Sequence, residues 1–274
     1  MIRDITLGQY YPSESTLHKL DPRVKLFGTL VYVISLFIVN NLIGYLLAFA
    51  FLVFCIALSK VPVKFMLKGL KAIVVLLVIA AVFNLLLTPG ETLWSFWKIT
   101  ITKEGVSTAS QMAVRLIFLI VGSSVMTLTT TPNNLTDGLE SGLRFLKIFK
   151  VPVHEIAMMM SIALRFIPIL LEETDKIMKA QLARGADFES GNIFKRAKAM
   201  VPLLVPLFVS AFRRANDLAM AMEARCYRGG KGRTKMKPLK YKGIDAAGYM
   251  VLFAYLGLCI YFGRIVTVVS VFGL

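Results

Sequence analysis

The 274-residue sequence has few of the side chains that carry catalysis or bind metals. It contains three cysteines and two histidines. Cys55, Cys226 and Cys259 show no paired spacing, and two of them lie in apolar runs, so we expect neither a disulfide framework nor a metal site. His18 and His154 are far apart in the sequence, and no nucleophile–base arrangement accompanies them. The sequence therefore argues against an enzyme, and we expect no cofactor in this chain.

Acidic residues are also scarce. The chain has 16 Asp and Glu against 32 Lys and Arg, a formal net charge of +16. Long apolar runs accompany this charge: 57% of the residues are hydrophobic, and the mean hydropathy is +0.69. A nucleic-acid-binding protein could share the charge but not the apolar runs. The combination is typical of a polytopic membrane protein with cytoplasmic Lys and Arg, so we expect a lipid bilayer and no nucleic acid as partner.

Five apolar segments are long enough to be candidate membrane spans, because about 20 helical residues cross about 30 Å of hydrocarbon. They are residues 24–39, 42–59, 70–88, 106–129 and 243–263. Before the first segment, Asp21 is a candidate N-cap and Pro22 suits the first helical position. The sequence therefore predicts an all-α polytopic membrane protein, with about five transmembrane helices and three cytoplasmic or interfacial coupling helices.

The loops between these segments predict the orientation of the chain. The loop 60–71 carries four lysines and no acid, which indicates the cytoplasmic side. The segment 89–105 has balanced charges and holds Trp94, Phe96 and Trp97, as expected of an aromatic belt at the outer interface. The N-terminus is then cytoplasmic and the C-terminus outside. We expect a membrane domain of four spans (1–131), a cytoplasmic coupling-helix domain (132–242) and a C-terminal transmembrane helix (243–274).

The predicted spans contain no internal Asp or Glu. Secondary carriers usually need intramembrane carboxylates or broken helices, so this absence weakens a carrier function without excluding it. Arg115 is the one charge well inside a span. It is either an anchor between helices or the mark of a substrate path. A self-sufficient secondary carrier or channel with a cytoplasmic regulatory domain therefore stays open as the alternative function.

The stretch between the fourth and fifth spans predicts three helices. The first is a short amphipathic helix with leucines at helical spacing, at positions 135, 139, 143 and 146. A long helix follows from Pro152 to about Gly185, and another from about Asn192 to about Cys226. Each has roughly 34 residues and is about 50 Å long. Pro168 is expected to bend the first long helix, and Pro202 and Pro206 to disturb the second.

Both long helices end in an arginine between small residues, in "QLARGADF" (181–188) and "MEARCYRG" (222–229). Small neighbours let a facing groove approach the backbone, and the guanidinium presents a planar fork that suits a carboxylate of another protein. A cation in a last helical turn is also common, because it interacts favourably with the helix dipole. The repetition at two helix ends favours docking, with Arg184 and Arg225 as the central residues.

Two further patterns concern the same helices. Glu172 and Glu173 lie as far before Arg184 as Arg213 and Arg214 lie before Arg225, so the two pairs could meet where the helices cross, or could be solvated faces. Methionines are frequent, either as core filling or as a surface that repacks against several partners. They are Met158, Met159, Met160, Met178, Met200, Met220 and Met222. The stretch "GGKGRTK" (229–235) lacks the spacing of a phosphate-binding loop, so we do not expect this chain to hydrolyse ATP.

Several segments together resemble the transmembrane T component (EcfT/CbiQ-like) of energy-coupling-factor ABC importers of vitamins and metals. They are "LHKLDPRVKL" (17–26), "TTTPNNLTDGL" (129–139), "ALRFIPILLEE" (163–173), "KAQLARGAD" (179–187) and "MEARCYRGG" (222–230). The resemblance covers nearly the whole chain. It implies a non-catalytic scaffold in the plasma membrane of a prokaryote.

The resemblance also implies the partners and the docking residues. Two ABC-type ATPase subunits would bind ATP and Mg²⁺ and dock at two X-Arg-X motifs, and a separate membrane S component would bind the vitamin. The motif residues here are Ala183, Arg184 and Gly185 at one end and Ala224, Arg225 and Cys226 at the other. Cysteine stands where glycine is commoner in the family, which puts the closeness of approach at that position in doubt.

Overall fold

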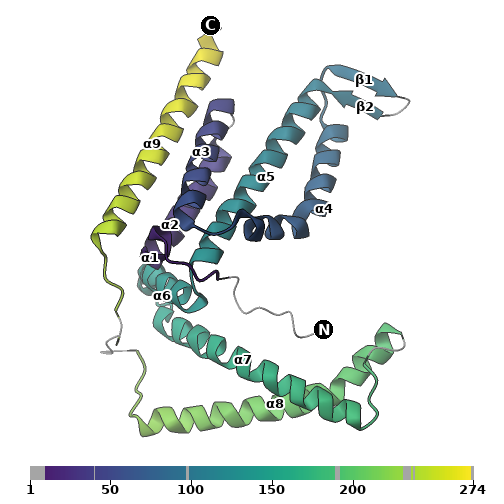
Figure 1. The fold of residues 1–274 in the computed structure, drawn as a ribbon, viewed down its shortest axis with the longest axis vertical. Helices are drawn as coiled ribbons and strands as arrows, with labels where there is room; N and C mark the ends of the chain where they lie inside the picture. Colours follow the sequence, from purple (N-terminus) through teal and green to yellow (C-terminus); the bar gives the residue numbers. More distant parts are fainter. Residues whose placement is uncertain are drawn as a thin grey trace. The chain divides into compact units, whose positions relative to one another are not determined.

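A computed structural model gives the fold of the chain (Figure 1). It describes residues 10–39, 41–96, 99–188, 192–230, 236 and 238–272. Helices dominate them, so the predicted all-α class is confirmed. In chain order the helices are α1 (Thr16–Lys19), α2 (Pro22–Ile38), α3 (Leu42–Ser59), α4 (Val63–Leu87), α5 (Lys103–Thr129), α6 (Pro132–Gly142), the 3₁₀ helix η2 (Leu143–Phe149), α7 (Val153–Ala183), α8 (Ile193–Ala224) and α9 (Gly243–Phe272).

Between α4 and α5 the chain forms a β-hairpin that the sequence analysis did not predict. Strands β1 (Thr92–Phe96) and β2 (Ile99–Thr102) pair antiparallel. Their β-branched and aromatic residues favour extended backbone. The Thr102 hydroxyl accepts a hydrogen bond from the Gly105 N–H at 3.0 Å and so caps α5. The hairpin lies in the segment expected at the outer interface, of which Trp97 is outside the described residues.

The described chain divides into two compact units. The first, the bundle unit, comprises residues 10–139 and 239–272, and the second, the long-helix unit, comprises residues 140–238. The domain limits expected from the sequence stay a prediction.

The bundle unit is built on α2, α3, α5 and α9. Pro22 occupies the first position of α2, and the Asp21 carboxylate caps the helix by accepting from the Arg23 N–H at 2.9 Å. The Ser35 and Tyr255 hydroxyls join α2 to α9 at 2.7 Å. Small residues let the helices approach, as expected inside a membrane. A Cβ at Gly122 of α5, for example, would collide with the Tyr32 ring.

Four described helices are long and apolar enough to cross a membrane: Leu42–Ser59, Lys103–Thr129, Val153–Ala183 and Gly243–Phe262. Three of them coincide with predicted spans. The predicted span 24–39 corresponds to α2, which has 17 residues, and the predicted span 70–88 contains the shorter apolar stretch Ile73–Leu87. Helix α7 is long and apolar enough to cross a membrane, although the loop charges predict a cytoplasmic position for it.

The long-helix unit contains η2, α7 and α8. The predicted amphipathic helix differs from expectation, because α-helix stops at Gly142 and the leucines at 143 and 146 fall in the 3₁₀ helix η2. Helices α7 and α8 each end two residues before the predicted limit, and both continue through their prolines. A proline inside a helix removes the N–H that would bond the carbonyl four residues earlier.

Candidate docking sites at two helix ends

The end of α7 is a Schellman cap. Arg184 is the C-cap residue, and Gly185 follows with φ of 87°. The Ala186 N–H donates to the Gln181 carbonyl at 3.0 Å, and the Gly185 N–H donates to the Leu182 carbonyl at 3.0 Å. This pair of bonds satisfies carbonyls that the helix leaves open at its end, and it requires a left-handed residue after the C-cap. Arg184 is thereby held at a sharp, defined helix terminus.

The end of α8 repeats this cap bond for bond. The Tyr227 N–H donates to the Met222 carbonyl at 3.0 Å, and the Cys226 N–H donates to the Glu223 carbonyl at 2.8 Å. Arg225 therefore stands where Arg184 stands in the first cap. Cys226 takes the left-handed position with φ of 55°, one of the few described residues other than glycine with positive φ. The sequence analysis considered only the size of this side chain and missed its backbone conformation.

The six residues of the two motifs are all exposed. A Cβ added at Gly185 would meet nothing within 4 Å, so glycine is needed there for its φ and not for packing within this chain. Among the described residues, neither the Arg184 nor the Arg225 guanidinium has a hydrogen bond or ion pair. Each guanidinium thus presents five N–H donors to a partner, in the geometry that matches a carboxylate.

Helices α7 and α8 cross, as Figure 1 shows, and an ion pair joins them. The Arg214 Nη2 donates to Glu173 Oε2 at 2.8 Å, and the Arg214 Nε donates to the same oxygen at 3.2 Å. The Ser210 hydroxyl donates to the other carboxylate oxygen. The Ser210 hydrogen bond, followed by that of Arg214, holds the pKa of Glu173 below its ordinary value. Glu173 and Arg214 lie at equal sequence distance from the two helix ends.

A second contact between the long helices follows from a proline. Pro206 lacks an N–H, so the Pro202 carbonyl of α8 loses the donor four residues later that a helix normally supplies. The Gln181 side chain of α7 donates to that carbonyl at 3.4 Å. Gln181 is three residues before Arg184, so this contact supports the end of α7 directly.

The other predicted features of these helices have different outcomes. Glu172 and Arg213 are exposed, and within the described chain no ion pair joins them to another residue. The seven methionines named for α7 and α8 are not among the buried core residues of the described chain. Met159, Met160, Met200 and Met220 are exposed, and Met158, Met178 and Met222 are half-buried. This placement favours a contact surface.

Arg115 of α5 faces the bundle. Its Nη2 donates to the Val39 carbonyl at 3.4 Å, and its guanidinium lies 5.6 Å from the centre of the Phe37 ring. Val39 is the C-cap of α2, where a cation interacts favourably with the helix dipole. These contacts favour the anchor function for Arg115 over the substrate-path function.

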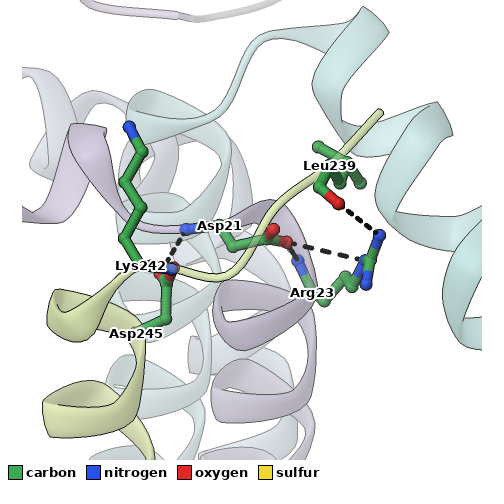
Figure 2. Close-up of polar contacts among 5 residues, drawn as sticks. All are labelled: Asp21, Arg23, Leu239, Lys242 and Asp245. Carbon is green, nitrogen blue, oxygen red and sulfur yellow. Dashed lines mark hydrogen bonds and ion pairs between the residues drawn. The ribbon is translucent and has the colours of Figure 1, made fainter. Parts of the chain in front are cut away.

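The start of α9 holds a contact that sequence reasoning missed (Figure 2). Asp245, with only 1% of its surface exposed, accepts from the Lys242 N–H at 2.6 Å and from the Asp21 N–H at 2.7 Å. One carboxylate thus caps α9 and also binds the N-cap residue of α2. Arg23 reaches across to the Leu239 carbonyl at 3.4 Å. An acid three positions after the N-cap indicates the first of these bonds but not the second.

Comparison with known proteins places the chain in a family. The family model described as CbiQ, cobalt transport protein, matches residues 13–236. A protein of Clostridium kluyveri is 56% identical over 247 residues, 89% of this chain and 92% of its own length. One from Ruminiclostridium cellulolyticum is 54% identical over 255 residues, 92% of this chain and 96% of its own length.

A protein of Bacillus subtilis is 46% identical over 248 residues, 90% of this chain and 94% of its own length. All three relatives bear the name energy-coupling factor transporter transmembrane protein EcfT. The family-model match includes both capped helix ends and the bundle helices α2, α3 and α5. The chain therefore belongs to the family described as CbiQ, cobalt transport protein, together with these EcfT transmembrane proteins.

Proposed function

We propose that this chain is the transmembrane scaffold subunit of an energy-coupling-factor ABC importer. It couples ATP hydrolysis by two ATPase subunits to the movement of a membrane S component that binds a vitamin or related micronutrient. The observation that carries the proposal is the pair of matching Schellman caps, each with an exposed arginine, at the ends of two crossed helices. A repeated docking element suits two similar partners better than one.

The contacts between α7 and α8 give the proposal a mechanism. ATP binding would bring the ATPases together and move their docking grooves. A rigid helix end transmits such a movement only if the helix cannot pivot independently. The Glu173–Arg214 ion pair and the Gln181–Pro202 hydrogen bond join the two helices, so the movement passes to the pair as a whole. The crossed helices then transmit it to the S component.

The remaining features fit a scaffold. The exposed methionines of α7 and α8 offer a surface that repacks, which suits an S component whose position changes during transport. ATP and Mg²⁺ belong to the ATPases, and this chain needs no cofactor and catalyses no reaction. We further propose a plasma-membrane location with the N-terminus in the cytoplasm and the C-terminus outside, since ATP is available on the side of the long-helix unit.

The proposal is tested by copurification from the native host. The tagged chain should retain two ATPase subunits and an S component, and the reconstituted complex should show ATP-dependent uptake. Combining Arg184→Ala with Arg225→Ala should remove the ATPases and uptake but leave the chain in the membrane. Arg213→Ala is the matched control, because Arg213 is also exposed on α8 and lies away from the helix end. Uptake by the chain alone, without ATPases, would instead support the secondary-carrier alternative.

A further inference from the structure

The bundle unit contains an apolar cavity of about 280 Å³. Helices α1, α2, α3, α5 and α9 line it. Helix α2 contributes Val24, Gly28 and Tyr32, which recur every four residues and therefore share one face, and Leu20 lines the cavity just before the helix. Helix α9 contributes a matching face that includes Gly248 and other small or aliphatic residues. The wall is almost entirely apolar, so the cavity suits a hydrocarbon ligand.

The cavity is built into the packing of α2 against α9. The two helices are joined at one end by the Asp21–Asp245 hydrogen bond and further along by the Ser35–Tyr255 hydrogen bond. Between these contacts α2 and α9 each bring a glycine to the cavity, Gly28 and Gly248. A Cβ at Gly28 would lie 3.8 Å from Leu252, in ordinary van der Waals contact, so the site has room for a methyl group. The space persists because fixed contacts on either side prevent the helices from closing it.

The α2 wall of the cavity is nearly as long as one leaflet of a bilayer is deep. This wall extends from Val24 to Tyr32, which is about 12 Å of helix at 1.5 Å per residue. Half of a hydrocarbon core of about 30 Å is about 15 Å. The end at Leu20 lies beside the polar start of α2, and the other end lies deeper in the predicted span. A lipid chain entering from the side of that polar start would therefore lie along the helices.

A cation lies at the polar end of the cavity. Lys25 lines the wall, and its ammonium donates to the Thr129 carbonyl at 2.9 Å and to the His18 carbonyl at 3.3 Å. An ammonium has three donors, so one is left for a further acceptor. An anionic phosphate complements this charge where an acyl chain alone would not.

We propose that a membrane phospholipid occupies this cavity as a bound component of the protein, with one acyl chain between α2 and α9 and its phosphate at Lys25. The ordered acyl chain fills space that the helices cannot fill themselves, and so stabilises the joined position of α2 and α9. This inference does not depend on ATPase docking.

The test uses the full chain in nanodiscs that contain a phospholipid with a photoreactive acyl chain. Cross-links should concentrate on peptides 20–32 and 244–252, and the lipid should survive transfer into mild detergent. Gly28→Leu should abolish both, because the added side chain enters the cavity. Gly257→Leu is the matched control on α9, since a Cβ there meets nothing within 4 Å and the position is exposed. Cross-links of equal yield in both variants would overturn the proposal.

Two further experiments test the lipid headgroup separately from its acyl chain, and neither requires the Gly28 variant to fold. Lys25→Gln should lower retention of the phospholipid after the detergent wash. A photoreactive free fatty acid should compete poorly with the phospholipid for the wild-type chain. Equal retention of fatty acid and phospholipid would overturn the phospholipid assignment. Loss of wild-type cross-links on adding the S component would assign the cavity to a protein partner and overturn the proposal as well.

Discussion

The ends of α7 and α8 make the same backbone hydrogen bonds with different residues. Gly185 has φ of 87° in the first cap, and Cys226 has φ of 55° in the second. Glycine adopts this conformation without steric cost, whereas a side chain brings Cβ close to a carbonyl oxygen. The comparison shows that both caps require a residue with left-handed backbone conformation after the arginine. A residue with a small side chain, such as cysteine, can adopt this conformation, but at an energetic cost.

The two ends also differ in their contacts with the rest of the long-helix unit. At α7, Gln181 binds the Pro202 carbonyl of α8 three residues before Arg184. At α8, the ion pair from Arg214 to Glu173 lies eleven residues before Arg225. Beyond the α8 end the chain returns to the start of α7, where a Cβ at Gly230 would collide with His154. Each end is thus oriented by α7–α8 packing, but at different distances.

The largest effect is expected from truncating the arginines. Arg184→Ala or Arg225→Ala should each weaken ATPase docking by about 2–5 kcal/mol, because a buried partner carboxylate would lose its charge pair. Lysine should restore only part of this, since it lacks the planar fork. With two sites on one scaffold, either single variant should remain partly assembled. Titration of purified ATPases onto the reconstituted chain measures these affinities, and a change no larger than that of Arg213→Ala would contradict docking at that end.

An exchange of the residues after the arginines should have a smaller effect. Cys226→Gly should stabilise the last turn of α8 by about 1 kcal/mol, and Gly185→Cys should destabilise the last turn of α7 by a similar amount. Hydrogen exchange measures both changes at the amides of Tyr227 and Ala186, which donate to the Met222 and Gln181 carbonyls in the two caps. Exchange rates that move in the same direction in the two variants would refute the shared-conformation account.

The smallest effect concerns the ion pair at the crossing. Glu173→Arg and Arg214→Glu should each loosen the helix pair, and the combination should recover part of the loss, whereas Glu172→Arg and Arg213→Glu should be additive. Because the folded pKa of Glu173 is depressed, its contribution is present above the ordinary carboxyl pKa of 4.5. It is lost as pH falls through the lower folded value. Proteolysis of the long-helix unit across pH reads this out, and simple additivity for Glu173 and Arg214 would exclude the pairing.

Much of this fold is predictable from the sequence, because apolar runs and helix signals are local. The N-cap Asp21, the start of α2 at Pro22 and the ends of the long helices all follow from residue type and spacing. The β-hairpin was missed because a short segment with two tryptophans also suits an interfacial loop. The switch to 3₁₀ helix after Gly142 was missed because leucine spacing alone does not distinguish the two helices.

The sequence predicts which residues form the candidate docking sites but not the contacts that orient them. Repetition of an arginine between small residues identified both ends. Which of Glu172 and Glu173 faces α8 depends on the helix crossing, which sequence spacing does not fix. The second bond of Asp245 joins residues 224 positions apart, and the cavity between α2 and α9 needs the packing of several helices. Such long-range contacts have no local signal.

The most direct test of the central claim places a thiol at the same position of each helix end. Cys226 supplies one, Gly185→Cys supplies the other, and Cys55 and Cys259 are replaced by alanine. Both thiols should react with a membrane-impermeant maleimide from the cytoplasmic side of the chain alone, and both should be protected when the ATPases bind. Arg184→Ala or Arg225→Ala should restore reactivity at its own end. A thiol that reacts equally fast with and without bound ATPases would contradict docking at that helix end.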